Sequence, residues 1–321
     1  FKKGKKANNQ DSYFIFEDLI PTNNQQNIVQ FYGVLDGHGP SGHKVSQYCS
    51  KYLPKILVSN EKMILLLLNK PNIALEKAFK MLEKQLINDK LNNNIDFDIN
   101  YSGTTITCCL CMNDTLYFAN LGDSRTLLGK LNTHTNKISM HQMCQDHDPT
   151  NPKETNRINK SKLGQIKYDD DGNARIEIKF IDNNINNHSN NNNNNNNMDG
   201  DLSSVKSISA SVSRSIGDKI AHDYGGVISI PEITIHNINN NDIFIVLGSD
   251  GIWTVIENDD IMRIIGTKLL HNNYSNNLQK LTDGLVREAN IVWTDEFDNY
   301  IDDITCIIAR IGKRSQYIHS L

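Results

Sequence analysis

Four aspartates in the sequence share one kind of setting, at the end of an expected β-strand. Asp36 and Asp250 each follow an apolar stretch and precede a glycine. Asp11 and Asp302 each stand just before an apolar stretch. Strand ends are rigid, so carboxylates placed there converge on one point with little ordering cost. Carboxylate, carbonyl and water oxygens are ligands of hard divalent cations, so these positions predict a Mg²⁺ or Mn²⁺ site.

The glycine after Asp36 has a specific use in such a site. Gly37 lies in the segment Asp-Gly-His-Gly, and without a Cβ its carbonyl oxygen can approach a metal closely. Asp-Gly is also a common turn dipeptide, and each pair taken singly is explained as well by a turn. The combination of four such sites weakens the turn explanation without removing it.

The expected elements that position these aspartates are grouped along the chain and do not strictly alternate. Strands are expected at 13–16, 30–35, 243–247 and 304–311, two or three between 104 and 131, and a hairpin at 165–181. Helices are expected at 42–57, capped by the Ser41 side chain, and at 72–91, 153–158, 259–269 and 276–289. This grouping favours an α+β fold with antiparallel sheets over a doubly wound parallel sheet.

The composition indicates an ordinary core diluted by polar insertions. Of 321 residues, 44 are Asn and 38% are apolar, and residues 183–197 are almost entirely Asn. We expect 183–197 to be a disordered insertion, because it has no apolar area to bury. The net charge of −4 argues against a nucleic-acid partner. The longest apolar run, 63–68, is too short to span a bilayer.

The six cysteines form no C-x-x-C pair, and three lie in one apolar stretch. Strand alternation places Cys109 and Cys111 on one face and Cys108 on the other. We expect reduced thiols in the core, and therefore an intracellular location in the cytoplasm, the nucleus or both. The chain begins at Phe1, so a preceding segment with a lipid anchor or another domain is compatible with it.

Eight motifs, in order along nearly the whole chain, carry a family resemblance. They are K-K-G-K-K-A-N-N-Q-D-S (2–12), Y-G-V-L-D-G-H-G-P-S-G-H (32–43), S-G-T-T-I (102–106), F-A-N-L-G-D-S-R (118–125), D-H-D-P-T-N-P-K-E-T-N-R-I (146–158), S-V-S-R-S-I-G-D (211–218), V-L-G-S-D-G-I-W (246–253) and D-D-I-T (302–305). The sequence resembles the metal-dependent serine/threonine protein phosphatases of type 2C, and is most similar to a branch common in plants and protists.

The resemblance implies two antiparallel sheets packed as a sandwich, with α-helices on both outer sides (α-β-β-α). It implies one catalytic domain over 1–321, with the Asn-rich segment 183–197 inserted in the flap beside the cleft. The implied reaction is hydrolysis of phosphoserine and phosphothreonine in protein substrates by a metal-activated water, without a covalent intermediate. The implied cofactors are two Mg²⁺ or Mn²⁺ ions and a possible weak third ion. We expect a monomer.

The resemblance also assigns the metal ligands. Asp36 matches the carboxylate that bridges the two ions, and the Gly37 carbonyl matches a ligand of the first ion. Asp250 and Asp302 match ligands of the second ion.

Further positions match residues around the metals. His38 matches the general acid for the leaving oxygen, although it could instead only orient metal-bound waters. Gln10 and Asp11 match residues that hold such waters. Thr105 and Asp123 match positions near the metals, and Asp123 is a candidate ligand of the third ion.

Four positions depart from the family pattern. Lys6 replaces the usual phosphate-binding Arg, and so gives a point charge in place of a bidentate fork. Gln10 stands where many members have Glu, and Asp303 replaces an Asn beside Asp302. Thr254 replaces an Asp, which puts the third-ion site in doubt.

Two other readings of function stay open. The departures at Lys6, Gln10 and Thr254 would suit a pseudophosphatase that binds partners without catalysis, whereas the intact metal ligands favour an active enzyme. A phosphatase of small phosphomonoesters is the third reading. Arg214 and Asp218 lie in a matching motif, and we expect both to be structural.

Overall fold

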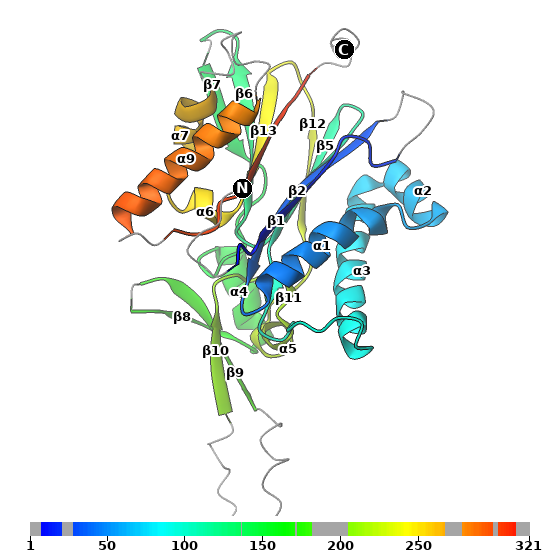
Figure 1. The fold of residues 1–321 in the computed structure, drawn as a ribbon, viewed down its shortest axis with the longest axis vertical. Helices are drawn as coiled ribbons and strands as arrows, with labels where there is room; N and C mark the ends of the chain where they lie inside the picture. The colour runs from blue at the N-terminus through cyan, green and yellow to red at the C-terminus, as the bar shows by residue number, and fades with distance from the viewer. Residues whose placement is uncertain are drawn as a thin grey trace, which may run out of the picture.

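The computed structural model of the 321-residue chain describes residues 8–20, 28–135, 137–170, 172–181, 205–266, 278–297 and 301–312. The Asn-rich segment 183–197 and Lys6 lie outside these ranges. Two antiparallel sheets form the centre, with helices on the outer side of each, as Figure 1 shows. The predicted α+β sandwich flanked by helices is therefore confirmed. No helix in the described ranges is both long enough and apolar enough to cross a membrane.

The first sheet has seven strands within the described residues. They are β1 (Asp11–Phe16), β2 (Val29–His38), β3 (Gly103–Thr104), β4 (Ile106–Met112), β5 (Thr115–Leu121), β11 (Ile216–Gly217) and β12 (Glu232–Asn237). Their order is β11-β3-β2-β4-β5-β12, and β1 pairs with β2. The long strand β2 is therefore central, and its C-terminal end meets β1 on one side and β3 on the other.

The second sheet contains four strands in the order β14-β13-β6-β7. They are β14 (Cys306–Arg310), β13 (Asp242–Gly248), β6 (Arg125–Asn132) and β7 (Lys137–Gln142). Residues on the inner faces of the two sheets meet in one apolar layer, which includes Val34, Phe118 and Leu247. Burying both faces of β2 explains why its apolar residues do not simply alternate with polar ones.

Three helices cover the first sheet: α1 (Gly42–Leu57), α2 (Glu61–Asn69) and α3 (Pro71–Leu91). The second sheet is covered by α9 (Leu278–Glu296), with the short α6 (Asp250–Trp253), α7 (Asn258–Ile261) and π-helical η3 (Met262–Gly266) beside it. The predicted placement of Cys108, Cys109 and Cys111 on the two faces of the strand is confirmed by this layering. Cys108 faces the helices, whereas Cys109 and Cys111 face the second sheet, and all six cysteines are free thiols.

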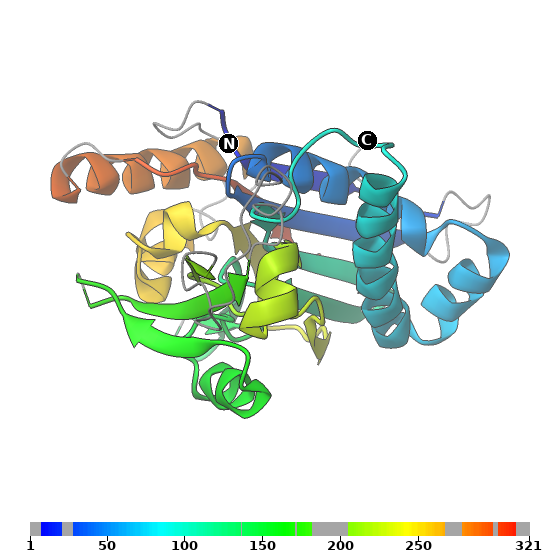
Figure 2. The ribbon, with the colours of Figure 1, turned by 90° about the horizontal axis from the view of Figure 1, so that it is seen from below.

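A third sheet of three strands lies at the lower end of the sandwich in Figure 1, and Figure 2 shows it from below. It consists of β8 (Gln165–Tyr168), β9 (Ala174–Ile181) and β10 (Val205–Ala210). Isoleucines of this sheet pack against α4 (Pro152–Ser161) and α5 (Lys219–Gly225). The predicted hairpin at 165–181 is thus confirmed, with Gln165 opposite Glu177 and Tyr168 opposite Ala174.

Some expected elements differ from the observed ones. The apolar run 63–68 forms most of α2, and β7, β12 and α5 were not among the expected elements. The predicted cap at Ser41 is wrong. Its side chain makes no cap hydrogen bond to α1, because its hydroxyl accepts a hydrogen bond from the Asp98 amide at 3.3 Å.

Candidate functional site

The ends of β1 and β2 bring two predicted site residues face to face. The antiparallel register pairs Asp11 directly with Asp36. The backbone of Asp36 is fixed from the other side by β3 and the residue after it. Its carbonyl accepts hydrogen bonds from the Thr105 amide at 2.9 Å and the Thr104 hydroxyl at 3.0 Å, and its amide donates to Thr105 Oγ1 at 3.1 Å. Thr105 therefore acts on the site through the backbone of Asp36.

Only glycine fits at position 37. Its amide donates to the Gln10 carbonyl at 3.1 Å. A Cβ there would lie 2.4 Å from the carbonyl oxygen of Gly42 and 2.5 Å from that of Gln10, both of them backbone atoms that cannot swing away. The side-chain amide of Gln10 donates to the Gly39 carbonyl at 2.7 Å. Gln10 therefore secures the Asp-Gly-His-Gly turn from both its main chain and its side chain.

The second sheet supplies the next carboxylate, just after β13. Asp250 is the first residue of α6, and Ser249 before it links three segments. The Ser249 hydroxyl donates to Asp11 Oδ2 at 2.8 Å and accepts from the Thr305 amide at 3.1 Å. The Ser249 amide in turn donates to the Thr305 carbonyl at 3.1 Å. Because of these bonds, Asp250 lies at the same end of the sandwich as Asp11.

The segment before β14 joins the site through Asp302 and Asp303. The Asp303 amide donates to Asp302 Oδ1 at 2.8 Å, and Asp303 Oδ2 accepts from the Gln10 amide at 2.8 Å. Asp303, the departure from the family's Asn, therefore has a structural contact of its own. Either Asp or Asn can accept this hydrogen bond from a backbone amide through a side-chain oxygen.

Burial and neighbouring carboxylates favour the protonated forms of Asp11 and Asp36. Burial, followed by the carboxylates of Asp250, Asp11 and Asp302, raises the pKa of Asp36 well above its usual value. Burial raises the pKa of Asp11 to about 7, with Asp250 and Asp303 adding to the shift and the hydroxyls of Thr305 and Ser249 opposing it. These shifts are typical of several carboxylates that share one buried space.

Asp123 belongs to the same electrostatic group. Burial raises its pKa to about 8, with further contributions from Asp250 and then Asp146, while His38 opposes the shift. The next residue, Ser124, shares a hydrogen bond with Thr105 at 2.7 Å between the hydroxyl oxygens. Asp146 is held by Arg125, whose Nε lies 3.2 Å from both carboxylate oxygens.

The residues present fit a hard divalent cation in chemistry and charge. The donors are carboxylate and carbonyl oxygens, which suit Mg²⁺ and Mn²⁺. Asp11 Oδ1 is buried and accepts no hydrogen bond of normal geometry from the described residues. In the described ranges, no three side chains of His, Cys, Asp or Glu already stand in a metal-binding arrangement. The group is thus an acidic cluster that a cation would stabilise, without a preformed cage.

His38, at the end of β2, has a partner from a distant part of the chain. Its Nε2 lies 2.6 Å from Asp218 Oδ2, and its side chain is 35% exposed. Although burial raises the pKa of Asp218, the His38 charge and the hydrogen bonds from His38 and Ser215 outweigh it, so this pKa lies below its usual value. Sequence reasoning assigned Asp218 a structural role only. The signal that could have found it is the motif itself, which ends in this aspartate.

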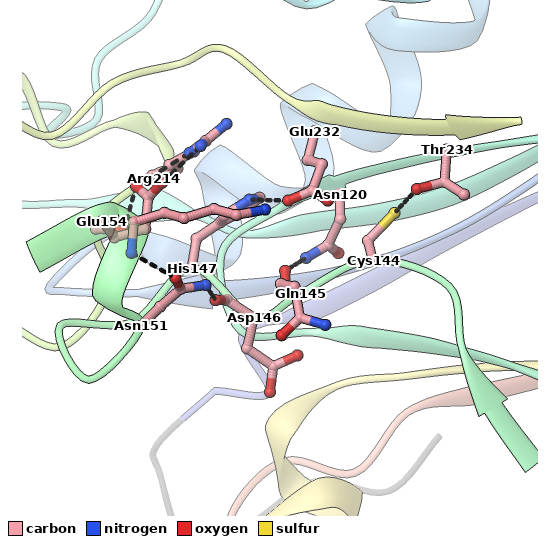
Figure 3. A network of polar contacts seen from close by, with 12 residues as sticks. Asn120, Cys144, Gln145, Asp146, His147, Asn151, Glu154, Arg214, Glu232 and Thr234 are labelled. Atoms are coloured by element: carbon pink, nitrogen blue, oxygen red, sulfur yellow. Dashed lines mark hydrogen bonds and ion pairs between the residues drawn. The ribbon is translucent and has the colours of Figure 1, made fainter. Parts of the chain in front are cut away.

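A second network of polar contacts includes Glu154 on α4, Arg214 and His147, and Figure 3 shows it. Glu154 is 2% exposed and accepts from Arg214 Nη2 at 2.6 Å and Arg157 Nη2 at 2.7 Å. His147 Nε2 lies 3.4 Å from Glu232 Oε2. The predicted structural role of Arg214 agrees with these contacts. Lys6, the predicted phosphate ligand, lies outside the described residues.

Comparison with known proteins agrees with the fold and the motifs. The family model described as protein phosphatase 2C matches residues 3–291. A probable protein phosphatase 2C 72 of Arabidopsis thaliana is 28% identical, with 98% of this chain and 85% of that protein covered. A probable protein phosphatase 2C 75 of Oryza sativa subsp. japonica is also 28% identical, with 83% of this chain and 62% of that protein covered.

Two solved structures share the fold. A serine-threonine phosphatase 2C from Toxoplasma gondii gives a TM-score of 0.73 at 18% identity, over 96% of this chain and 92% of that one. A C. elegans sex determining protein gives 0.69 at 18% identity, over 98% of this chain and 64% of that one. Because the family model covers most of its length, the chain belongs to the protein phosphatase 2C family.

Proposed function

We propose that the chain hydrolyses phosphoserine and phosphothreonine in protein substrates, with two Mg²⁺ or Mn²⁺ ions as cofactors. The observation that carries the proposal is the acidic cluster at the strand ends, where burial and neighbouring carboxylates raise the pKa of Asp11, Asp36 and Asp123. Burying several carboxylates together is costly unless cations compensate their charge. Membership of the family supports the same activity.

The proposed ligand roles are those that the family resemblance implies. Asp36 would bind both ions, the Gly37 carbonyl one of them, and Asp250 and Asp302 the other. Bound ions of this kind lower the pKa of a water so that hydroxide is available to attack phosphorus near neutral pH. Asp123 would hold the weak third ion. The Asp36 backbone is secured by three hydrogen bonds, so its carboxylate has little freedom to lose when it binds.

Other residues would handle the substrate. His38 would donate a proton to the serine or threonine oxygen as the phosphorus–oxygen bond breaks. Lys6 would contact the phosphate, while Gln10 and Asp11 would hold waters around the ions. The water oxygen forms the new bond to phosphorus and the seryl or threonyl oxygen leaves, so no covalent enzyme intermediate is needed.

Five of the six cysteines are poorly suited to act as an alternative nucleophile. Burial raises the pKa of Cys144 and Cys306 to about 12 and shifts that of Cys49, Cys108 and Cys109 upward too. The thiolate is the reactive form, and these thiols stay protonated near neutral pH. Water attack therefore fits the site better than a phosphocysteine.

We further propose that residues 1–321 form one catalytic domain that acts as a monomer.

The test is a phosphothreonine-peptide assay with Mn²⁺ or Mg²⁺, with chelator, and with Asp36→Ala. We expect turnover that needs the metal and falls at least about a thousandfold in the variant, since the metal contributes several kcal/mol to the transition state. Asp114→Ala, an exposed aspartate in the β4–β5 turn, is the matched control and should behave as the wild type. No turnover by the wild type would leave the pseudophosphatase reading. Turnover of sugar phosphates alone would favour the small-molecule reading.

A further inference from the structure

The contact between His38 and Asp218 is built by three separate segments. The register of β2 and β3 pairs His38 with Gly103, and that of β3 and β11 pairs Gly103 with Gly217, next to Asp218. A Cβ at Gly103 would lie 2.2 Å from Asp218 Oδ2, so the carboxylate occupies the space that glycine leaves. These two short pairings thus bring the carboxylate of Asp218 to the ring of His38.

The backbone of Asp218 is held in an unusual conformation. Its φ is 43°, in the left-handed region, although it is not a glycine. Its amide donates to the Ser102 carbonyl at 3.0 Å, and the Ser215 hydroxyl donates to its Oδ2 at 2.6 Å. Such a conformation costs on the order of 1 kcal/mol and persists where surrounding contacts impose it, often at functional sites.

A buried acid on α3 accepts a hydrogen bond from the residue just before Asp218. Glu83 is 8% exposed, and its Oε2 accepts a hydrogen bond from the Gly217 amide at 3.0 Å. Gly217 also has a left-handed φ, of 89°. The side chain of Glu83 therefore fixes the residue just before Asp218, which is a costly use of a buried carboxylate if Asp218 only capped α5.

We propose that Asp218 is a positioning residue that sets the ring orientation and tautomer of His38 for the leaving-group step. The inference rests on the proposed function and deepens it. With Nε2 bonded to Asp218 Oδ2, the proton that moves to the substrate is the one on Nδ1. As the phosphorus–oxygen bond breaks, the leaving oxygen takes the Nδ1 proton. The other proton stays on His38 Nε2, which donates it in a hydrogen bond to Asp218 Oδ2.

The test uses Asp218→Asn, which keeps the size of the side chain and tolerates the left-handed backbone. A general acid matters most when the leaving oxygen is strongly basic. We therefore expect kcat on a phosphothreonine peptide to fall about 10- to 100-fold, against less than about threefold on p-nitrophenyl phosphate, whose leaving group needs little protonation. KM for the peptide should change little.

Two further variants make the result specific. Asp223→Asn makes the same substitution within α5, the helix that begins directly after Asp218, at an exposed residue that pairs with Lys219 at 2.6 Å. It should leave the turnover of both substrates unchanged. His38→Gln combined with Asp218→Asn should be no slower on the peptide than His38→Gln alone, because both act on one step. Equal losses on both substrates, or additive losses in the double variant, would overturn the proposal.

A readout that needs no turnover separates this inference from the proposed function. In ¹H–¹⁵N spectra of the Mg²⁺-loaded protein, with the His38 signal assigned by His38→Gln, the wild type should show a downfield proton on Nε2. Asp218→Asn should move or remove that signal, and Asp223→Asn should not. An unchanged His38 spectrum in Asp218→Asn would refute the positioning role. If the wild type hydrolysed neither substrate, the proposed function would fail and the spectrum alone would decide on Asp218.

Discussion

The negative charge of buried carboxylates is compensated in opposite ways at two sites in this chain. Glu154, in the network of Figure 3, is surrounded by Arg214, Arg157 and Ser213. Burial raises its pKa, but the hydrogen bonds from the two arginines outweigh burial and lower the pKa to about 2. At the strand ends, burial and neighbouring acids raise the pKa of Asp11 to about 7. The first site carries its own positive charge, whereas the second has an excess of acids.

This difference in charge compensation distinguishes a carboxylate with a structural role from carboxylates with a functional one. A buried carboxylate is tolerated where the chain supplies arginines, and such a site is complete without any ligand. Where the chain instead places carboxylates beside carboxylates, the positive charge must come from protons or cations. The strand-end cluster should therefore lower the stability of the cation-free fold, and the binding of a cation would offset that cost.

The largest expected effect is on the complete site. Glu154→Gln would leave two arginines facing a neutral amide in a buried position, so we expect the free energy of unfolding to fall by about 3–5 kcal/mol. Chemical denaturation with chelator present measures this. Glu177→Gln, in a surface pair with Lys167 at 2.7 Å, is the control and should cost less than about 1 kcal/mol. A loss as small as the control's would mean that the arginines do not depend on Glu154.

The incomplete site should respond to metal instead. Mg²⁺ or Mn²⁺ at about 100 times its dissociation constant should stabilise the wild type by about 2.7 kcal/mol, because the ion binds only the folded chain. Asp36→Asn should lose this increment, whereas Glu154→Gln should retain it on a lower baseline. Thermal unfolding with and without metal measures both. An equal gain for Asp36→Asn would place the ion elsewhere.

The two sites should also give opposite slopes of stability against pH. Asp11 binds its proton more tightly in the folded chain, so its contribution is present below pH 4 and is lost as pH rises towards 7. With chelator present, we expect Asp11 alone to remove about 2 kcal/mol between pH 5 and pH 7. Glu154, whose pKa is lowered to about 2, loses its contribution as pH falls from about 4.5.

Unfolding titrations of the metal-free protein across this range test the slopes. Asp11→Asn should flatten the decline between pH 5 and pH 7 and leave the acid side unchanged, while Glu154→Gln should do the reverse. A wild-type stability that rises between pH 5 and pH 7 would contradict the raised pKa of Asp11 in the strand-end cluster.

The grouping of the expected elements predicted an antiparallel α+β fold, and the family resemblance implied the sandwich. The strand-end positions of the aspartates predicted that they lie together. Apolar stretches ending in Asp-Gly identify a strand end, and motif order identifies the family's arrangement. The pairing of Asp11 with Asp36 follows from antiparallel strands of the right length. The hairpin at 165–181 was equally readable, since a turn signal separates two β-rich runs.

The sequence could not predict contacts made by short or irregular segments. Pairing of β11 with β3 involves two residues on each strand, too few for any periodic signal. Yet this pairing is what brings Asp218 to His38. Ser249 was overlooked for a similar reason, because a serine before Asp-Gly has no pattern that reveals its partners, Asp11 and Thr305. Substitution of Ser249 has the smallest expected effect of the predictions made here.

Ser249→Ala removes a hydroxyl that is 0% exposed and bonds both Asp11 and the Thr305 amide. A hydrogen bond to an ionised group is worth about 1.5–3 kcal/mol and one to a neutral group about 0.5–1.5 kcal/mol. The cost of the substitution should therefore rise by about 1 kcal/mol between pH 5, where Asp11 is protonated, and pH 8, where it is charged. Denaturation with chelator at the two pH values measures the increase. Thr294→Ala, whose hydroxyl bonds only the Asn290 carbonyl on exposed helix surface, should show none. A cost for Ser249→Ala that is the same at both pH values would mean that its hydroxyl does not sense the charge of Asp11, and the serine would then belong with the complete, structural kind of site.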